Sequence, residues 1–327
     1  MPLPAVLLSL LLGIASMSAA NDSWAAKLRI GYSAITATMA PLWGAQEKGL
    51  FVKYGVDAEL IYLAGGSRIA LALESDSIQL GQIALNAGVE ARLAGGDVTI
   101  IGSVYDRYYF QIFSKPIITN AAQLKGKIIA ASSAGSASDY GIRDALESVG
   151  LKEGDYKILY VGGTDARVQA LQQGLADTAI ISPPNGLIAQ KLGFREIVNL
   201  MEMKIPFGYG AIAAKESWLK QQRALAINFY KAYLETLAAL RQDVSFAQRI
   251  IGKYSRIGDR EILQESYRTS IPNMPTRPYV NKDLVARALK MSRRDAARRA
   301  EPEQFYDNGI VKELDDSDFI NALFGKR

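Results

Sequence analysis

Six short stretches of the sequence consist almost entirely of small, hydroxylated or amide residues, and such stretches can present several uncharged hydrogen-bond donors to a ligand. The clearest is Ser132-Ser133-Ala134-Gly135-Ser136-Ala137-Ser138, which leads into a helix predicted from Asp139. Serine hydroxyls, free backbone N–H groups and the positive end of a helix dipole would together stabilise an oxyanion there. Simple N-capping of the helix by Ser136 or Ser138 explains the same residues and stays open at this point. The six stretches are residues 33–40, 65–67, 85–87, 132–138, 162–165 and 182–185.

Other kinds of chemistry have little support. The chain has no histidine and no cysteine, which excludes a cysteine nucleophile, a disulfide framework, an iron–sulfur cluster, a Ser-His-Asp triad and an ordinary zinc site. No phosphate-binding G-x-x-x-x-G-K-[ST] motif occurs. Residues 208–213 match G-x-G-x-x-A, but they follow Pro206-Phe207 instead of a strand, and we predict a turn with close backbone packing. We expect no enzyme, no cofactor and no metal.

The elements that must position these stretches alternate between strand and helix. Such alternation predicts an α/β fold with parallel, doubly wound sheets, in which ligands bind at the carboxyl ends of the strands. Residues 62–88 resemble residues 160–186, which indicates two similarly built lobes, although chance likeness of two such units is the alternative. The predicted strands are 28–32, 59–63, 80–85, 127–131 and 157–161, and the predicted helices are 41–51, 68–74, 88–93, 139–149 and, after residue 206, a largely helical region that includes 283–300.

Length and charge set the broad class. A chain of 327 residues favours two domains. Its net charge of +5 is small for a nucleic-acid-binding protein of this size, and we expect no nucleic-acid partner. The arginines of the predicted helix 283–300 are interleaved with acidic residues, which is typical of a solvated helix surface.

The N-terminus resembles a secretory signal peptide. An apolar run over residues 3–17 is followed by Ser18, Ala19 and Ala20, which predicts a signal peptide over residues 1–20, with cleavage as late as Ala25. Residues 1–20 contain no Lys or Arg, in contrast to the usual basic start of such segments. Without a cysteine there is no lipidation site at the cleavage point, so we expect a free, exported protein.

Five blocks of the mature chain, taken together in their order and spacing, are similar to the sulfonate-, taurine- and nitrate-binding periplasmic proteins of ABC importers and to their thiamine-pyrimidine-precursor-binding relatives. The blocks are "APLWGAQEKGLFVKYGVDAEL", "GGSRIALAL", "LKGKIIAASSAGSASDYGIRDALESVGL", "ALQQGLADTAIISPP" and "FYDNGIVKEL". The resemblance implies a type II periplasmic-binding-protein fold, with two lobes, a central ligand cleft and two crossing strands at 105–115 and 205–214. It implies a first lobe of residues 27–112, a second lobe of 113–208, and a return to the first lobe with C-terminal helices over 209–327.

The resemblance also implies which residues contact the ligand. Tyr108 and Tyr209 are expected to wall the cleft, with burial at the hinge as the alternative. After the last strand of the second lobe this chain has Pro183-Pro184-Asn185, where relatives are expected to carry ligand-specific aromatic and charged residues. Arg68, Arg107 and Arg143 are candidate partners for an anion, although solvated or hinge positions explain them as well. The remaining expected contacts are Ser33, Thr36, Gly66, Ser67 and Asn86 in the first lobe and Ser133, Ser136, Ser138, Thr164 and Asn185 in the second.

The implied function is that of a monomeric periplasmic receptor that captures a small solute by lobe closure and delivers it to an ABC permease in the inner membrane. A sulfonate-, taurine- or nitrate-like anion is the favoured solute. A pyrimidine or aromatic solute and a role as a ligand-sensing subunit are the alternatives. An enzyme of the same fold, the thiamine-pyrimidine synthase, uses a histidine and a cysteine-rich motif that this chain lacks.

Overall fold

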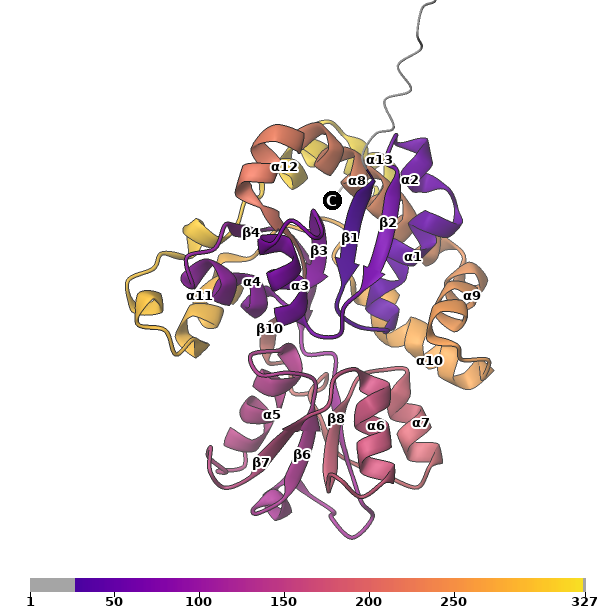
Figure 1. Ribbon diagram of the computed structural model, residues 1–327. Coiled ribbons are helices and arrows are strands. Elements are labelled where there is room, and N and C mark those ends of the chain that lie inside the picture. The colour runs from indigo at the N-terminus through magenta and orange to yellow at the C-terminus, as the bar shows by residue number, and fades with distance from the viewer. Residues whose placement is uncertain (1–26, 326–327) are drawn as a thin grey trace, which may run out of the picture.

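The computed structural model describes residues 27–325, which form two α/β lobes, each built around a five-stranded sheet (Figure 1). The strand order is β2-β1-β3-β10-β4 in the first lobe and β7-β6-β8-β5-β9 in the second. The signal peptide predicted over residues 1–20, with its latest cleavage point at Ala25, lies outside the described residues.

In the first lobe, β1 lies parallel to β2 and β3, while β10 runs antiparallel to β3 and β4. Each parallel strand is followed by a helical segment, because the chain must return across the sheet before it can start the next parallel strand. The strands are β1 (Leu28–Tyr32), β2 (Ala58–Tyr62), β3 (Leu80–Ile83), β4 (Val98–Arg107) and β10 (Pro206–Lys215), and the helices are η1 (Ala37–Met39), α1 (Ala40–Glu47), α2 (Leu50–Lys53), α3 (Gly66–Glu74) and α4 (Leu85–Leu93).

The second lobe repeats this plan. Strand β6 lies parallel to β7 and β8, and β5 runs antiparallel to β8 and β9. The units β2-α3-β3 and β7-α6-β8 therefore occupy equivalent places, in agreement with the sequence likeness of residues 62–88 and 160–186. The elements are β5 (Gln111–Ser114), η2 (Ala121–Leu124), β6 (Ile128–Ala131), α5 (Ala137–Glu147), β7 (Lys157–Tyr160), α6 (Thr164–Gln172), β8 (Thr178–Ile181), α7 (Asn185–Lys191) and β9 (Arg195–Asn199).

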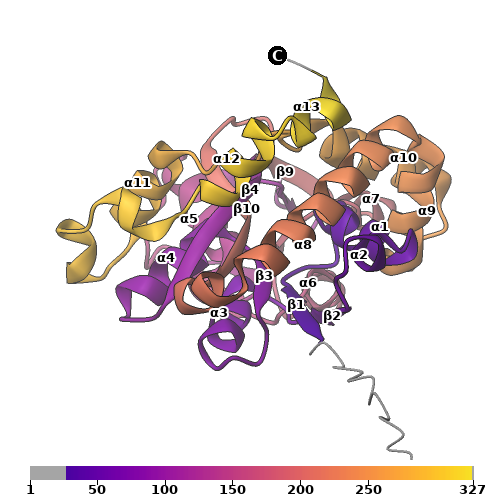
Figure 2. The same cartoon turned by 90° about the horizontal axis from the view of Figure 1, so that it is seen from above.

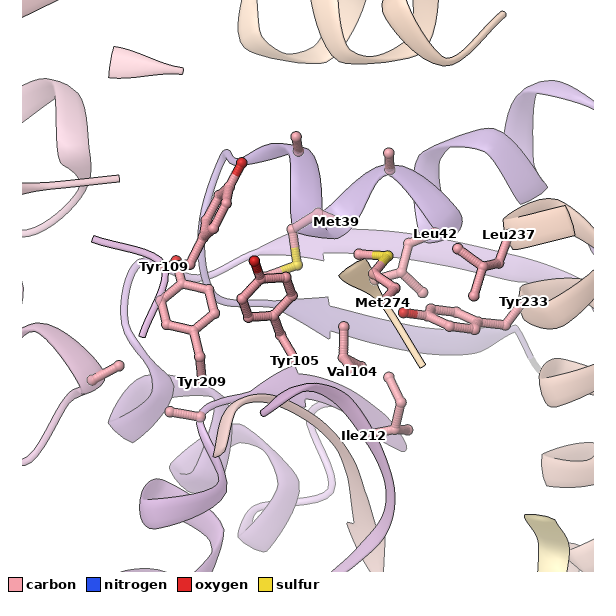
Figure 3. Close-up of a cluster of buried hydrophobic side chains, with 14 of the residues drawn as sticks. Met39, Leu42, Val104, Tyr105, Tyr109, Tyr209, Ile212, Tyr233, Leu237 and Met274 are labelled. Atoms are coloured by element: carbon pink, nitrogen blue, oxygen red, sulfur yellow. The ribbon is translucent and has the colours of Figure 1, made fainter. Parts of the chain in front are cut away.

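The chain passes between the sheets twice, from β4 to β5 and from β9 to β10. Strand β5 already begins at Gln111 and β10 at Pro206, so the predicted lobe limits of 112 and 208 fall inside strands. The crossings are rich in buried tyrosine: Tyr105, Tyr109 and Tyr209 cluster beside Met39 (Figure 3), with Tyr105 and Tyr109 ring centroids 5.2 Å apart. Such large buried rings hold the junction of the two lobes together.

The segment that matches G-x-G-x-x-A lies within strand β10, and the prediction of a turn is wrong. Residues 210–215 pair with β4, and the close packing expected of the glycines is present. A Cβ atom built on Gly208 would lie 2.5 Å from Leu85 Cβ, and one built on Gly210 would lie 3.0 Å from Val104 Cβ. These glycines therefore allow α4 and β4 to approach the strand closely.

The C-terminal third is helical and packs on the first lobe. Helices α12 and α13 lie along α8 (Figure 2), whose buried Phe229, Tyr233 and Leu237 face the core. None of the helices within residues 27–325 is long and apolar enough to cross a membrane. The C-terminal elements are α8 (Glu216–Gln242), α9 (Val244–Ser255), α10 (Arg260–Ser270), η3 (Ile271–Asn273), α11 (Lys282–Met291), η4 (Asp295–Arg298), η5 (Pro302–Phe305), α12 (Gly309–Asp316) and α13 (Phe319–Phe324).

The helix predicted over residues 283–300 is wrong in its second half. Helix α11 ends at Met291, Ser292 is extended, and only a short 3-10 turn, η4, follows. Outside the helix, Arg293 pairs with Glu153 and Arg294 pairs with Glu90 at 3.0 Å. The local sequence favours a longer helix, but the residues after Met291 form ion pairs with distant parts of the chain instead.

Candidate functional site

A small cavity of about 50 Å³ lies between the lobes and is lined from both. A volume of this size holds a compact chemical group or a few water molecules. The lining residues are Ser33, Ala34, Met39, Gly65, Gly66 and Ala84 from the first lobe, Ser132, Ser136, Ala137, Ser138, Gly163, Thr164, Arg167 and Ser182 from the second, and Phe110 and Tyr209 near the crossings.

Four helices begin at this cavity. Its lining includes the N-cap residues Gly65 of α3, Ala84 of α4, Ser136 of α5 and Gly163 of α6. This convergence follows from the fold, because the helices start where the parallel strands end. The free backbone N–H groups and the positive ends of the helix dipoles give the cavity a preference for negative charge.

The serine-rich loop contributes a cluster of three hydroxyls. The Oγ atoms of Ser132, Ser136 and Ser138 lie 2.9 Å from one another, and the backbone N–H of Ser132 donates to Ser138 Oγ at 3.0 Å. Ser136 also caps α5, because its Oγ accepts from the N–H of Asp139 at 3.3 Å. The sequence left two interpretations open, N-capping and ligand binding. Ser136 both caps the helix and lines the cavity.

Arg167 places a buried positive charge at the cavity. It stands in the first turn of α6 with 4% of its surface exposed, and its guanidinium donates to Thr164 Oγ1 at 2.6 Å and to the carbonyl oxygens of Gly163 and Ile180. No carboxylate of residues 27–325 forms an ion pair with it. Burial lowers the pKa of Arg167 to about 10, which leaves the group charged at neutral pH. A buried cation that forms no ion pair with the described part of the chain favours an anionic ligand.

Tyr209 and Phe110 form the aromatic side of the cavity, with ring centroids 5.1 Å apart in an edge-to-face arrangement. Burial raises the pKa of Tyr209 to about 12, against the opposing effect of Arg167. The phenol is therefore neutral under physiological conditions. Its hydroxyl is available as a donor, and Arg167 lies over the Phe110 ring at 5.7 Å.

The structure brings part of the predicted set together at the cavity. Serine and threonine hydroxyls dominate this part, as expected from loops at the carboxyl ends of strands. The predicted residues that line the cavity are Ser33, Gly66, Ser136, Ser138, Thr164 and Tyr209.

Four predicted contacts do not line the cavity, and each of them contacts another protein group. Thr36 Oγ1 lies 2.8 Å from Thr38 Oγ1, Asn86 faces the Met291 sulfur, and Asn185 donates to Asp165. Tyr108 is fully buried at the crossing, where it stacks on Phe207 at 4.1 Å and donates to Asp144 at 2.7 Å. The expectation that Tyr108 walls the cleft is therefore corrected to its alternative, burial at the hinge.

Two further predicted contacts border the cavity without lining it: Ser67 in the first turn of α3 and Ser133 in the loop before α5. Ser67 Oγ donates to the carbonyl oxygen of Ala134 in the opposite lobe at 3.2 Å. The Oγ of Ser133 is buried without a hydrogen-bond partner among the described residues. It lies next to Gly65, whose φ of +91° and lack of a side chain allow this close approach.

Sequence analysis missed Arg167 and proposed three other arginines for an anion. Arg68 is exposed, Arg107 pairs with its neighbour Asp106 at the surface, and Arg143 pairs with Asp139 and Glu153, so none of them lines the cavity. A usable signal existed. Arg167 shares a helix face with the apolar Leu171 four residues later, and this face is buried. A charged side chain on a buried face is rare unless it has a partner, so the position of Arg167 could have indicated a ligand.

Comparisons with known proteins identify the family of this chain. The family model described as NMT1/THI5 like matches residues 36–243. No curated protein matches the chain.

Several solved structures share the fold at low sequence identity. The alkanesulfonate-binding protein of Xanthomonas axonopodis pv. citri, bound to MOPS, is 19% identical, with a TM-score of 0.71 over 88% of this chain and 97% of that one. The periplasmic aliphatic sulphonate binding protein of Escherichia coli is 19% identical, with a TM-score of 0.67 over 91% and 90%. The periplasmic nitrate-binding protein of Synechocystis PCC 6803 is 17% identical, with a TM-score of 0.70 over 89% and 88%. These likenesses confirm the predicted fold class.

Proposed function

This chain belongs to the NMT1/THI5-like family, and we propose that it is the solute-binding receptor of an ABC-type importer, which captures a small anion between its two lobes. The observation that carries the proposal is a buried arginine, Arg167, that forms no ion pair within residues 27–325 and lies where four helix N-termini converge. The alkanesulfonate-, aliphatic sulphonate- and nitrate-binding proteins that share this fold support the same ligand class.

In the proposed mechanism, the ligand favours the closed arrangement because it contacts both lobes at once. Gly66 and Ser33 approach it from the first lobe, and Arg167 with the hydroxyls of Ser136 and Ser138 approaches it from the second. A ligand shifts the equilibrium between open and closed forms only through interactions that differ between them, and contacts across the cleft exist only when the lobes are closed. The closed form would then deliver the solute to a membrane permease.

Export to the periplasm as a protein without a lipid anchor belongs to the same proposal. It is supported by the apolar N-terminal run of residues 3–17 and by the absence of cysteine from the chain. The partner is accordingly an inner-membrane ABC permease.

The test is a binding experiment on Arg167 variants. Purified protein is titrated with methanesulfonate, taurine, nitrate, benzoate and an uncharged pyrimidine, and the melting temperature is followed. A ligand at about 100 times its dissociation constant stabilises the protein by about 2.7 kcal/mol. We expect an anion to raise the melting temperature of the wild type and of the matched control Arg107→Met, whose exposed arginine pairs only with Asp106 at the surface.

Arg167→Met should lose this response, while Arg167→Lys, which keeps the charge but not the planar donor set, should retain part of it. The partial response of the lysine variant separates loss of charge from loss of fold. If only the pyrimidine stabilises the protein, through contacts with Phe110 and Tyr209, the ligand is an aromatic solute and the proposal of an anion is refuted. Equal anion binding by Arg167→Met would refute the assigned role of the arginine.

A further inference from the structure

The segment of residues 290–299, which we call the basic segment, carries most of the excess positive charge of the chain. It holds five basic residues and one acidic residue, a net charge of +4, whereas the whole chain has a net charge of +5. Because helix α11 ends at Met291, most of these charges do not lie along a solvated helix face as the sequence indicates. The charged residues are Lys290, Arg293, Arg294, Asp295, Arg298 and Arg299.

Two alanines hold the basic segment against the first lobe. Ala297 and Ala300 pack against the apolar cluster that contains Phe305. The backbone N–H of Ala297 donates to the carbonyl oxygen of Arg294 at 3.0 Å, and the side chain of Arg294 pairs with Glu90 of α4. The segment therefore has a defined place, where it projects from one side of the molecule (Figure 1, Figure 2) with its charged side chains exposed.

Three cations of the basic segment are available to an external partner. Lys290 and Arg299 are exposed and form no ion pair within residues 27–325. In the same part of the chain Arg298 pairs only with Asp295, at 3.6 Å, and the two side chains are 84% and 94% exposed. A pair so exposed holds its partners weakly, because water and salt screen the attraction. These residues also border a surface hollow of about 400 Å³, which is large enough for a phosphate group.

The composition of the basic segment favours a lipid surface over a protein as its partner. Protein interfaces are centred on buried aromatic or large aliphatic side chains. Between residues 292 and 300 the only apolar residues are alanines, of which Ala297 and Ala300 already face the core. An anionic bilayer needs no apolar anchor, because it attracts each nearby Lys or Arg by charge and strengthens binding about fivefold per residue. Arginine also matches a phosphate group with two parallel hydrogen bonds.

We propose that the basic segment binds the anionic surface of a phospholipid bilayer, with Lys290, Arg298 and Arg299 at the lipid phosphate groups. The attraction is electrostatic and reversible, so the protein stays near a bilayer without being inserted into it. None of the three residues lines the cavity at Arg167, so bilayer binding does not depend on the proposed capture of an anion.

The experiment is co-sedimentation of the purified protein with vesicles of phosphatidylcholine alone and of phosphatidylcholine mixed with phosphatidylglycerol. We expect binding only to the vesicles that contain the anionic phosphatidylglycerol. Binding should weaken at least tenfold when the ionic strength rises from about 0.01 M to about 0.15 M, because screening shortens the range of charge attraction from about 30 Å to about 8 Å. The triple variant Lys290→Gln, Arg298→Gln, Arg299→Gln should bind at least tenfold more weakly than the wild type.

The matched control is the triple variant Lys157→Gln, Arg195→Gln, Arg260→Gln. It removes one lysine and two arginines from exposed positions on β7, β9 and α10, and none of them forms an ion pair within residues 27–325. Its net charge equals that of the first variant, and it should bind the vesicles like the wild type. Both variants should keep the wild-type melting temperature, because all six side chains are exposed. Asp295→Asn should strengthen binding severalfold, since it removes the one negative charge of the segment.

Three results would overturn the proposal or part of it. Equal weakening in both triple variants would show that net charge governs binding and would refute the role of the basic segment. If the wild type does not bind the phosphatidylglycerol vesicles at low ionic strength, the bilayer is refuted as the partner and an acidic protein surface takes its place as the candidate. If the variant of Lys290, Arg298 and Arg299 loses methanesulfonate binding that the wild type shows, the two sites are not separate.

Discussion

At the scale of single residues, the site depends on groups whose charge state is constant over the physiological pH range. The chain has no histidine and no cysteine, the side chains that most often titrate near neutrality. Burial disfavours the charged form of Arg167 and lowers its pKa to about 10, and burial raises the pKa of Tyr209 to about 12. At pH 7 the guanidinium of Arg167 is therefore a cation and the phenol of Tyr209 is neutral, and a change of one or two pH units in either direction alters neither state.

We therefore expect ligand affinity to be independent of pH between about 6 and 9 and to fall as pH rises through the pKa of Arg167. The sign follows from the lowered pKa: the binding-competent, charged form is present below about pH 10 and is lost above it. Calorimetry with methanesulfonate, which is ionised throughout, measures this profile. The melting temperature of the unliganded protein at each pH is the control. A change in affinity of more than threefold between pH 6 and 8 would contradict the assignment.

At the scale of elements, the start of α5 combines a structural role with the binding role that we propose. Ser136 caps the helix through the N–H of Asp139 and belongs to the hydroxyl cluster with Ser132 and Ser138. An N-cap serine commonly contributes about 1 kcal/mol to stability. The same position at the positive end of the helix dipole suits an anion.

Ser136→Ala should therefore lower the free energy of unfolding by about 1 kcal/mol and also weaken anion binding severalfold. Asp243→Ala is the matched control, because Asp243 caps α9 by accepting from the N–H of Phe246 at 2.8 Å and lies away from the cavity. It should cost a similar amount of stability and leave the affinity unchanged. Urea denaturation and titration of both variants provide the comparison. An affinity loss shared by both would show that stability alone is responsible.

At the scale of the whole molecule, the lobes are joined by ion pairs at the margins of the cleft. Asp144 of α5 lies 2.6 Å from Arg287 of α11 and also accepts from Tyr108 at the crossing. On the opposite margin, Lys191 of α7 pairs with Asp259, the N-cap residue of α10. In the proposed mechanism of lobe closure, such pairs stabilise the closed arrangement modestly, because most of these groups are partly exposed to solvent.

Asp144→Asn should shift the unliganded protein toward open forms and reduce ligand affinity by about threefold to tenfold, since closure then gains less. Asp76→Asn is the control: Asp76 pairs at 2.9 Å with Lys215 of the same lobe. Small-angle scattering should show a larger radius of gyration for Asp144→Asn alone. If both variants keep the wild-type radius and affinity, the pair between Asp144 and Arg287 does not influence closure.

The sequence by itself determined the local elements, the likeness of the two lobes, and the loops that meet at the site. Hydrophobic periodicity and glycine-bounded turns are local signals, so the strands 28–32 and 157–161 and the hydroxyl-rich loop 132–138 could be read directly. Only the tertiary structure decided which residues line the cavity. Tyr108 stacks on Phe207 and donates to Asp144. Asn185 donates to Asp165, and the side chain of Arg167 is buried. The helix 283–300 likewise ends at Met291, where Arg293 and Arg294 reach carboxylates far away in the sequence. The partners lie in other elements, 20 residues away for Asn185 and Asp165, 36 for Tyr108 and Asp144 and 204 for Arg294 and Glu90, and periodicity within a single segment carries no record of them.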